Sequence, residues 1–284
     1  MSEIKAGDIV ARVSHGRDVL FKITKFFTKR GHDMATLRGL DIRLEADAPL
    51  PDLVKIPREE VSAYWKKVMT KGGEQVRRCF ERREKEQIKN RPNDKAEPFD
   101  VPGKVLHIDG DEDYFDLCMS TYKQLGVPAE GYNIPEKDQP QRVQELLQKH
   151  MPDILVLTGH DGFKKGKKDF RDINNYRNSK YFIEAVKNAR RYEKNRDDLV
   201  IFAGACQSYY EALLEAGANF ASAPERVLIH AFDPVFVAEK VSYTPVYRQV
   251  PLREILEGTI TGYPGVGGID TLGKYRMGVP KSNY

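Results

Sequence analysis

From residue 102 to the C-terminus, short apolar runs alternate with amphipathic stretches. Two runs have the length and the β-branched content of buried parallel strands, within residues 153–158 and 198–203. Two more strands of the series are expected at residues 104–109 and 130–134. The stretches with apolar residues at helical spacing are 113–125, 141–150, 179–193 and the residues after Cys206. One or two further strands are expected at 219–224 and 226–231. This alternation predicts an α/β fold with a mostly parallel sheet and helices on both faces.

Residues 1–57 follow a different pattern. Five short runs alternate apolar and polar positions between turns rich in glycine, histidine and proline, at 7–14, 18–26, 34–40, 41–46 and 52–56. In the second run Val19, Phe21 and Ile23 share one side. The pattern is typical of a small SH3-like β domain. Whether that domain docks a substrate or partner, or is a structural cap, stays open, because a fold does not give a function.

Residues 58–98 are expected to form a charged helical connector with breaks at Gly72-Gly73 and at Pro92. Its first helix has an apolar face for docking, made of Val61, Tyr64, Trp65 and Val68. The arginines that follow are expected on a solvated face that runs into a flexible linker: Arg77, Arg78, Arg82 and Arg83. The α/β domain then covers residues 99–284.

Composition narrows the classes of function. The chain has 284 residues, of which 40% are apolar, which is enough for one large domain and one small domain. Because there is no apolar run of about 18 residues and no N-terminal signal sequence, we expect a cytoplasmic protein without a membrane partner. Residues 58–98 hold 12 Lys/Arg and 8 Asp/Glu, which accounts for the whole net charge of +4. The basic excess belongs to the connector, so no nucleic-acid partner is expected.

The three cysteines, Cys79, Cys118 and Cys206, cannot all pair, and none has metal-ligand spacing. Neither a disulfide framework nor a structural zinc is therefore expected. Cys118 lies in the helical pattern 113–125 and is expected in the core. His107 and His230 lie in apolar strand patterns and are expected to be core histidines, although His230 also ends its run.

Two strand ends carry the candidate chemistry. His160 follows the run 153–158, and Cys206 follows the run 198–203. Ligands of open α/β sheets bind outside the carboxyl ends of the strands, so these side chains form a thiol–imidazole pair if their strands are adjacent. Cys206 would then be the nucleophile, and His160 would protonate the leaving amine. This chemistry requires no metal and no organic cofactor.

The turn after the second strand is predicted to activate Cys206. A helix that opens at Cys206 would lower the pKa of the thiol through its dipole and its free N–H groups. An oxyanion hole needs backbone N–H groups close to the nucleophile. The candidates are the N–H groups of Cys206 itself and of the two residues after His160, which are Asp161 and Gly162.

The order of the two residues resembles a known group of enzymes. His160 precedes Cys206 by 46 residues, and an alanine comes directly before the cysteine. This arrangement is similar to that of the caspase, gingipain and clostripain cysteine peptidases, and it implies a caspase-like sheet. Two positions depart from the pattern, because Asp161 separates His160 from Gly162 and Ser208 stands where caspases have glycine.

Segments spread over nearly the whole chain resemble one family, the YabG sporulation-specific peptidases of spore-forming bacteria. They are GDIVAR, PGKVLHIDGDEDY, PDILVLTGHD, LVIFAGACQS, AGANFASAPERV, IHAFDPV and GGIDTLG. The resemblance implies a cysteine peptidase whose catalytic residues are His160 and Cys206. It also implies an enzyme of the mother-cell cytoplasm or the spore coat that processes spore coat and cortex-associated proteins late in sporulation.

The clostripain-like and gingipain-like peptidases cleave after Arg or Lys through acidic pockets, and by this analogy we expect a preference for basic residues. Four carboxylates are candidates for the pocket: Asp109, Asp111, Asp161 and Asp233. The exposed arginines of the connector would then be the nearest substrate, which predicts self-cleavage there.

Two other functions compete with this hypothesis. Asp109 and Asp111 follow a strand in the D-x-D arrangement with which Mg-dependent phosphoryl-transfer enzymes hold their ion, although such residues also cap helices. Cys206 has no use in that site. The other alternative is a non-catalytic spore scaffold, in which Cys206 would be buried and inert. Within the peptidase hypothesis, His230 is an alternative partner of the thiol.

Overall fold

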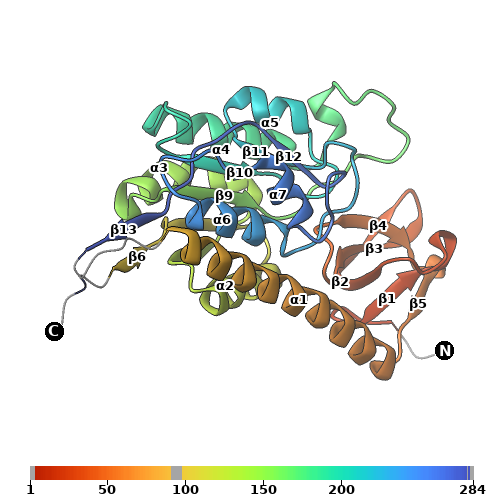
Figure 1. The fold of residues 1–284 in the computed structure, drawn as a ribbon. Coiled ribbons are helices and arrows are strands. Elements are labelled where there is room, and N and C mark those ends of the chain that lie inside the picture. The colour runs from red at the N-terminus through yellow and green to blue at the C-terminus, as the bar shows by residue number, and fades with distance from the viewer. Residues whose placement is uncertain (1–3, 91–97, 280, 282–284) are drawn as a thin grey trace.

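The computed structural model describes residues 4–90, 98–279 and 281. A small antiparallel sheet, one long helix and a larger α/β part follow one another along the chain (Figure 1). The α/β part is built on a six-stranded sheet with the strand order β12-β11-β10-β9-β7-β8. Five strands of this sheet are parallel to one another, namely β8, β7, β9, β10 and β11. The sixth strand, β12, pairs antiparallel with β11. The predicted mostly parallel sheet is therefore confirmed.

Strands and helices of the α/β part alternate along the chain. In order they are β6 (Phe99–Val101), β7 (Val105–Asp109), α2 (Glu112–Leu125), β8 (Ala129–Asn133), α3 (Gln139–His150), β9 (Ile154–Thr158), α4 (Ser179–Tyr192), β10 (Val200–Ala203), α5 (Tyr210–Ala216), β11 (Phe220–Ser222), α6 (Asp233–Tyr243), α7 (Leu252–Glu257), β12 (Val266–Gly268) and β13 (Arg276–Gly278). β6 and β13 form a separate two-stranded ribbon.

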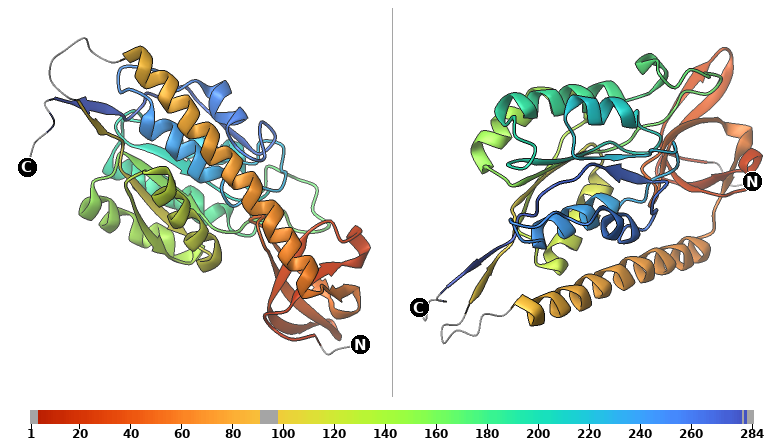
Figure 2. Two further views of the ribbon diagram at one scale, coloured as in Figure 1. Left: turned by 60° about the horizontal axis from the view of Figure 1, so that its bottom comes forward. Right: turned by 45° about the horizontal axis from the view of Figure 1, so that its top comes forward.

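Each central strand contributes to two hydrophobic cores, because successive side chains of a strand point to opposite faces. In β9, Ile154 and Val156 belong to the core that contains α2 and α6. Leu155 and Leu157 belong to the core that contains α3 and α4. Figure 2 shows these two helical layers on opposite sides of the sheet. Continuous apolar runs such as the one in β9 are thus explained by burial on both faces.

The N-terminal sheet consists of five antiparallel strands in the order β4-β3-β2-β1-β5. They are β1 (Ile9–Arg12), β2 (Leu20–Lys29), β3 (His32–Gly39), β4 (Glu45–Pro49) and β5 (Leu53–Lys55). Val19, Phe21 and Ile23 are buried on one side, as their alternation predicts. The likeness of this sheet to an SH3 domain stays a prediction.

Two expected strands, 41–46 and 226–231, do not form as regular strands. β4 begins only near the end of the first range, and the second range belongs to no sheet. Instead, the two segments meet each other through an antiparallel bridge between Ile42 and His230. The connection between β3 and β4 therefore lies against the α/β part.

The expected break of the connector at Gly72-Gly73 is wrong, because α1 (Arg58–Asn90) is one continuous helix. Tyr64, Trp65 and Val68 pack on the core of the α/β part, as the apolar face predicts. Gly72 lies against the ring of Phe232, where a Cβ atom would come within 2.9 Å of a ring carbon. Gly72 is thus needed for a close approach of the helix and not for a turn. The expected break at Pro92 lies outside the described residues.

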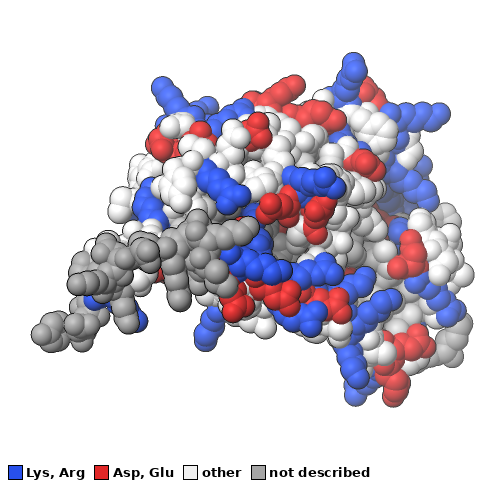
Figure 3. All heavy atoms as spheres, in the orientation of Figure 1, with Lys and Arg blue, Asp and Glu red and all other residues white. Residues whose placement is uncertain are grey.

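The expected solvated face of the connector is also partly wrong. Lys, Arg and Glu side chains cover the outward side of α1 in Figure 3, and Arg77 and Arg78 are exposed. Arg82 and Arg83, however, both bind Glu239 of α6, whose carboxylate is fully buried. These two arginines are therefore not available as self-cleavage sites. No helix in the described part of the chain is both long enough and apolar enough to cross a bilayer.

Replacing Glu239 by Gln should lower the free energy of unfolding by about 3 kcal/mol. The carboxylate is buried and neutralises two arginines, and breaking a buried ion pair leaves uncompensated charge. Burial opposes its ionisation, but Arg82 and Arg83 lower its pKa below the ordinary value. Urea unfolding followed by circular dichroism gives the measurement. The matched control is Glu81→Gln, which removes an exposed pair with Arg77 and should cost less than about 0.5 kcal/mol. Equal effects of the two substitutions would contradict the role given to Glu239.

Candidate active site

His160 and Cys206 lie at the same edge of the sheet, on neighbouring strands. β9 and β10 are parallel, and their last register pair joins Leu157 to Ala203. Each candidate residue lies three positions beyond that pair, so both reach the same height above the carboxyl ends. The two strands are thus adjacent, which was the condition on which the thiol–imidazole hypothesis depended.

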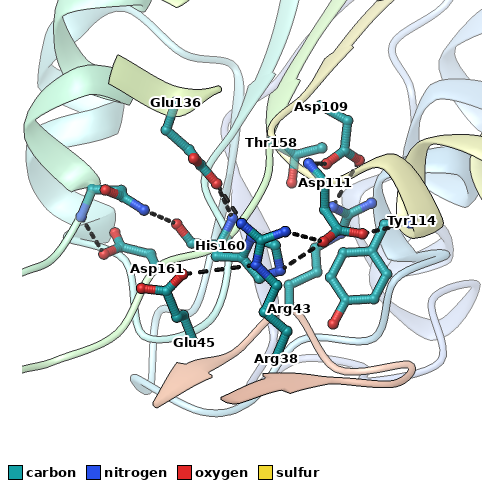
Figure 4. Close-up of polar contacts among 12 residues, drawn as sticks. Arg38, Arg43, Glu45, Asp109, Asp111, Tyr114, Glu136, Thr158, His160 and Asp161 are labelled. Carbon is teal, nitrogen blue, oxygen red and sulfur yellow. Dashed lines mark hydrogen bonds and ion pairs between the residues drawn. The ribbon is translucent and has the colours of Figure 1, made fainter. Parts of the chain in front are cut away.

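Two carboxylates flank the imidazole of His160, but only Glu136 forms a hydrogen bond with it in the described part of the chain. Glu136 Oε1 accepts a hydrogen bond from the backbone N–H of His160 at 2.7 Å and lies 3.3 Å from its Nδ1 atom. On the other side of the ring, Nε2 lies 3.3 Å from an oxygen of Asp111. Tyr114 packs on the ring, with 5.2 Å between the ring centroids. Figure 4 shows Glu136 and Asp111 pointing at the ring from two sides.

The orienting role of Glu136 was missed by sequence reasoning. Glu136 begins a short 3-10 turn shortly after β8 and reaches back across the sheet edge toward β9. Gly110 and Gly159 leave the space for it, because a Cβ atom at either position would overlap the Glu136 carboxylate. Burial opposes the ionisation of Glu136, but the hydrogen bonds from His160 outweigh it and lower the pKa of the carboxyl. In the sequence, the glycines that follow the neighbouring strands β7 and β9 were the signal that a side chain from another segment lies there.

The environment of Cys206 differs from the one predicted. The thiol is fully buried, and Sγ accepts a hydrogen bond from the backbone N–H of Ile229 at 3.0 Å. α5 begins four residues later, at Tyr210, so Cys206 does not open the helix. Burial raises the pKa of the thiol, contrary to the expected lowering. In the described part of the chain, no hydrogen bond joins Cys206 to His160.

The candidate oxyanion donors are in different states. The N–H group of Cys206 donates to the carbonyl oxygen of Arg43 at 3.4 Å. The N–H group of Gly162 donates to the carboxylate of the preceding Asp161 at 2.8 Å and is therefore engaged. The N–H group of Cys206 thus already binds a carbonyl group in this structure, and the part of the Asp161 N–H group as an oxyanion donor stays a prediction.

Asp109 lies at the bottom of the site and holds an arginine of the N-terminal sheet. Arg43 Nη1 lies 2.8 Å from Asp109 Oδ2, and both side chains are fully buried. Burial opposes the ionisation of Asp109, but the charge of Arg43 outweighs it and lowers the pKa of the carboxyl to about 2. Arg43 Nη2 donates to Cys118 Sγ at 3.2 Å and to the carbonyl oxygen of Ala231 at 2.9 Å. The role of Arg43 had no sequence signal, because its partners are remote in the chain.

The other three carboxylates each have partners besides His160. Asp111 caps α2 through the N–H of Tyr114 and pairs with Arg38 at 3.0 Å. Asp161 accepts hydrogen bonds from Gly162, Asn178, Ser179 and Ser208. Asp233 accepts from His230, Ile260 and Thr261. Burial raises the pKa of both Asp161 and Asp233, and that of Asp233 reaches about 6. In this structure Asp161 and Asp233 bind backbone and hydroxyl groups of the fold, and their place among the pocket candidates stays a prediction.

The remaining histidines and cysteines mostly support the core. His107 is buried between Tyr122 and Asp109, as a core histidine would be. Cys79 and Cys118 are buried and free. His107, Asp109 and Cys118 bring metal-binding atoms within 4.8 Å of one another. The guanidinium of Arg43 contacts Asp109 and Cys118, so in this structure the side chain of Arg43 supplies the positive charge at the cluster.

The chain was compared with known proteins. A family model described as YabG peptidase U57 matches residues 5–280. The chain belongs to this family. The sporulation-specific protease YabG of Bacillus subtilis (strain 168) is 44% identical over 289 residues, which cover 99% of this chain and 100% of the relative. Membership of the YabG family makes the chain a peptide hydrolase, and it confirms the resemblance that the sequence segments indicated.

Replacing Glu136 by Gln should lower kcat about 100-fold with little change in KM. The amide cannot stabilise the imidazolium that forms when His160 takes a proton, and it need not hold the same ring orientation. Steady-state cleavage of a short peptide substrate provides the measurement. Glu145→Gln is the matched control, because Glu145 is an exposed residue of α3 that pairs with Arg142. If Glu136→Gln has the kcat of the wild type, Glu136 has no role in orienting His160 or in compensating its charge.

Proposed function

We propose that this chain is a cysteine endopeptidase that cleaves after basic residues, with Cys206 as the nucleophile and His160 as the proton carrier. One observation carries the proposal. Arg43 places its guanidinium on Asp109 while its carbonyl oxygen accepts a hydrogen bond from the N–H of Cys206. These are the two contacts that an arginine residue before a scissile bond would need.

The proposed reaction uses these contacts. His160 first takes the proton of the Cys206 thiol. The thiolate then attacks the carbonyl carbon of the substrate, and the oxyanion that forms is held by the N–H of Cys206 until the C–N bond breaks. His160 transfers a proton to the leaving amine, while Glu136 keeps the ring oriented and compensates its charge. Water then hydrolyses the thioester, and the second product leaves as a carboxylate. Since burial raises the pKa of the thiol, the resting thiol is neutral and needs a change of surroundings before attack.

The contacts of Asp109 and Asp111 favour the peptidase over a magnesium-dependent phosphoryl-transfer enzyme. Each carboxylate already binds an arginine, and Asp111 also caps α2. His230 is the weaker candidate for the partner of the thiol. It lies beside Asp41, with 3.5 Å between Nε2 and the carboxylate, and burial lowers its pKa to about 3. A base with so low a pKa carries protons poorly near neutral pH.

The relative from Bacillus subtilis is named as a sporulation-specific protease. We infer the same context for this chain, with proteins of the spore coat and cortex as its substrates and the mother cell as its place of action. This part of the proposal rests on the family and on no contact in the site. Self-cleavage of the chain remains part of the proposal, although its buried connector arginines are excluded.

Cleavage of a mixed peptide library, read by mass spectrometry, should occur after Arg and Lys and should disappear in Cys206→Ala. The substitution removes the proposed nucleophile and leaves the acidic pocket around Asp109 intact. Cys79→Ala is the matched control, because Cys79 is buried in α1 and lies away from the strand tips. Cleavage that survives in Cys206→Ala would contradict the mechanism. Cleavage that survives in His160→Ala and is lost in His230→Ala would move the proton carrier to His230.

Replacing Asp109 by Asn should lower the preference for arginine about 100-fold. The measured quantity is the ratio of kcat/KM for two peptides that differ only by Arg or citrulline before the scissile bond. An amide cannot neutralise a buried guanidinium, but it accommodates the uncharged citrulline. Asp113→Asn is the control, because Asp113 is an exposed residue of the neighbouring helix. An unchanged ratio of the two kcat/KM values would show that the pocket for basic residues is not formed by Asp109.

A further inference from the structure

The space over the carboxyl ends of β9 and β10, here called the cleft, is occupied by residues 41–44 of the same chain. These four residues are here called the cleft segment. It leaves the N-terminal sheet between β3 and β4 and crosses the carboxyl edge of the large sheet. Arg43 N–H donates to the carbonyl oxygen of Ile229 at 2.9 Å, and Ala231 N–H donates to the carbonyl oxygen of Asp41 at 2.7 Å. Proteins commonly bind extended peptides by such added-strand pairing.

The Arg43 side chain fills a pocket in which both terminal nitrogens of its guanidinium have partners, whereas its Nε atom has none among the described residues. Asp109 supplies the charge, Cys118 and the carbonyl oxygen of Ala231 accept further hydrogen bonds, and the ring of Tyr114 lies 5.1 Å from the guanidinium carbon. A guanidinium is costly to bury unless charge and hydrogen bonds compensate it. The pocket is therefore complementary to an arginine side chain.

The peptide bond after Arg43 lies between the two catalytic candidates. The carbonyl oxygen of Arg43 accepts from the N–H of Cys206, and the next residue, Leu44, forms a parallel bridge with Asp161, directly after His160. The cleft segment thus runs in the direction of a substrate, with residues 41–43 on the acyl side. Its presence explains why Cys206 and His160 are almost fully buried, at 0% and 1% exposure.

Both ends of the cleft segment are fixed, unlike those of a free substrate. Leu44 N–H donates to the carbonyl oxygen of Ile42 at 2.6 Å, and Gly39 N–H donates to that of Leu44 at 3.0 Å. Tyr64 of α1 binds the side chain of Asp41, and Tyr114 binds the backbone of Gly39 and Ile42. β3 and β4 remain paired on either side. The segment is therefore held in a tight loop that cannot leave the cleft as a product would.

We propose that the cleft segment is an intramolecular inhibitor, in which Arg43 occupies the arginine pocket and closes the active site until the N-terminal sheet moves away. The proposal rests on the proposed function, since it takes the pocket of Asp109 as the substrate pocket. It gives the N-terminal sheet a regulatory role. A substrate with arginine before its scissile bond competes with the segment for the same contacts.

Arg43→Ala in the full chain tests the proposal. The rate at which iodoacetamide alkylates Cys206 should rise at least about tenfold, because the segment loses the pair that holds it in the cleft. Cleavage of a short peptide that ends in an arginine–coumarin amide should start without a lag. Arg43→Lys should give an intermediate alkylation rate, because an ammonium reaches Asp109 but cannot match the planar guanidinium contacts. Arg17→Ala, at an exposed turn of the same sheet, is the matched control and should behave as wild type.

Buried Cys79 reports on the fold within the same samples, because its alkylation rises only if the chain unfolds. An unchanged Cys206 rate in a folded Arg43→Ala variant would overturn the proposal. If that variant unfolds, hydrogen exchange of the wild-type chain decides. A tripeptide argininal should accelerate exchange at residues 41–44 and 231 by displacing the segment, and binding without such acceleration would overturn the proposal. Alkylation and exchange do not require turnover, so failure of the proposed function alone appears as absent cleavage in every variant.

Discussion

The buried ion pair between Arg43 and Asp109 is the contact on which the arrangement of the site depends. Both charges are removed from water, which is costly unless their attraction and further hydrogen bonds compensate. Cys118 and the carbonyl oxygen of Ala231 supply those bonds. Because Arg43 lies in the connection between β3 and β4 and Asp109 ends β7, the pair fixes the N-terminal part of the chain on the α/β part, next to Cys206.

Carboxylates at the strand tips have different roles because their neighbours differ. Asp109 faces a guanidinium and stays ionised despite complete burial. Asp111 is divided between the N-terminus of α2 and Arg38, whereas Glu136 reaches over two glycines to hold His160. Asp161 is surrounded by neutral donors, so burial raises its pKa and it organises loops. All four residues are carboxylates. Their surroundings decide whether the carboxylate binds a guanidinium, orients His160 or organises a loop.

The long helix α1 holds this arrangement from outside. Its first turns contact the cleft segment through Tyr64 and Asp41, and its middle lies against Phe232 because Gly72 has no side chain. Further along, Arg82 and Arg83 neutralise the buried Glu239 of α6. Movement of the N-terminal sheet away from the cleft would therefore break the contact of Tyr64 with Asp41 or shift α1 itself. The connector predicted as a solvated helix is thus a structural link between the two parts.

The sequence by itself determined the alternation of strands and helices, the mostly parallel sheet and the placing of His160 and Cys206 at strand ends. These features follow from local periodicity, which each segment carries within itself. Only the tertiary structure decided that residues 41–44 pair with residues 229–231, that Glu136 reaches His160 and that α1 runs unbroken through Gly72. It also reversed the expected direction of the Cys206 pKa, because burial depends on what covers the thiol and not on the residues beside it. Contacts between distant segments leave no local pattern, and the site is made almost entirely of such contacts.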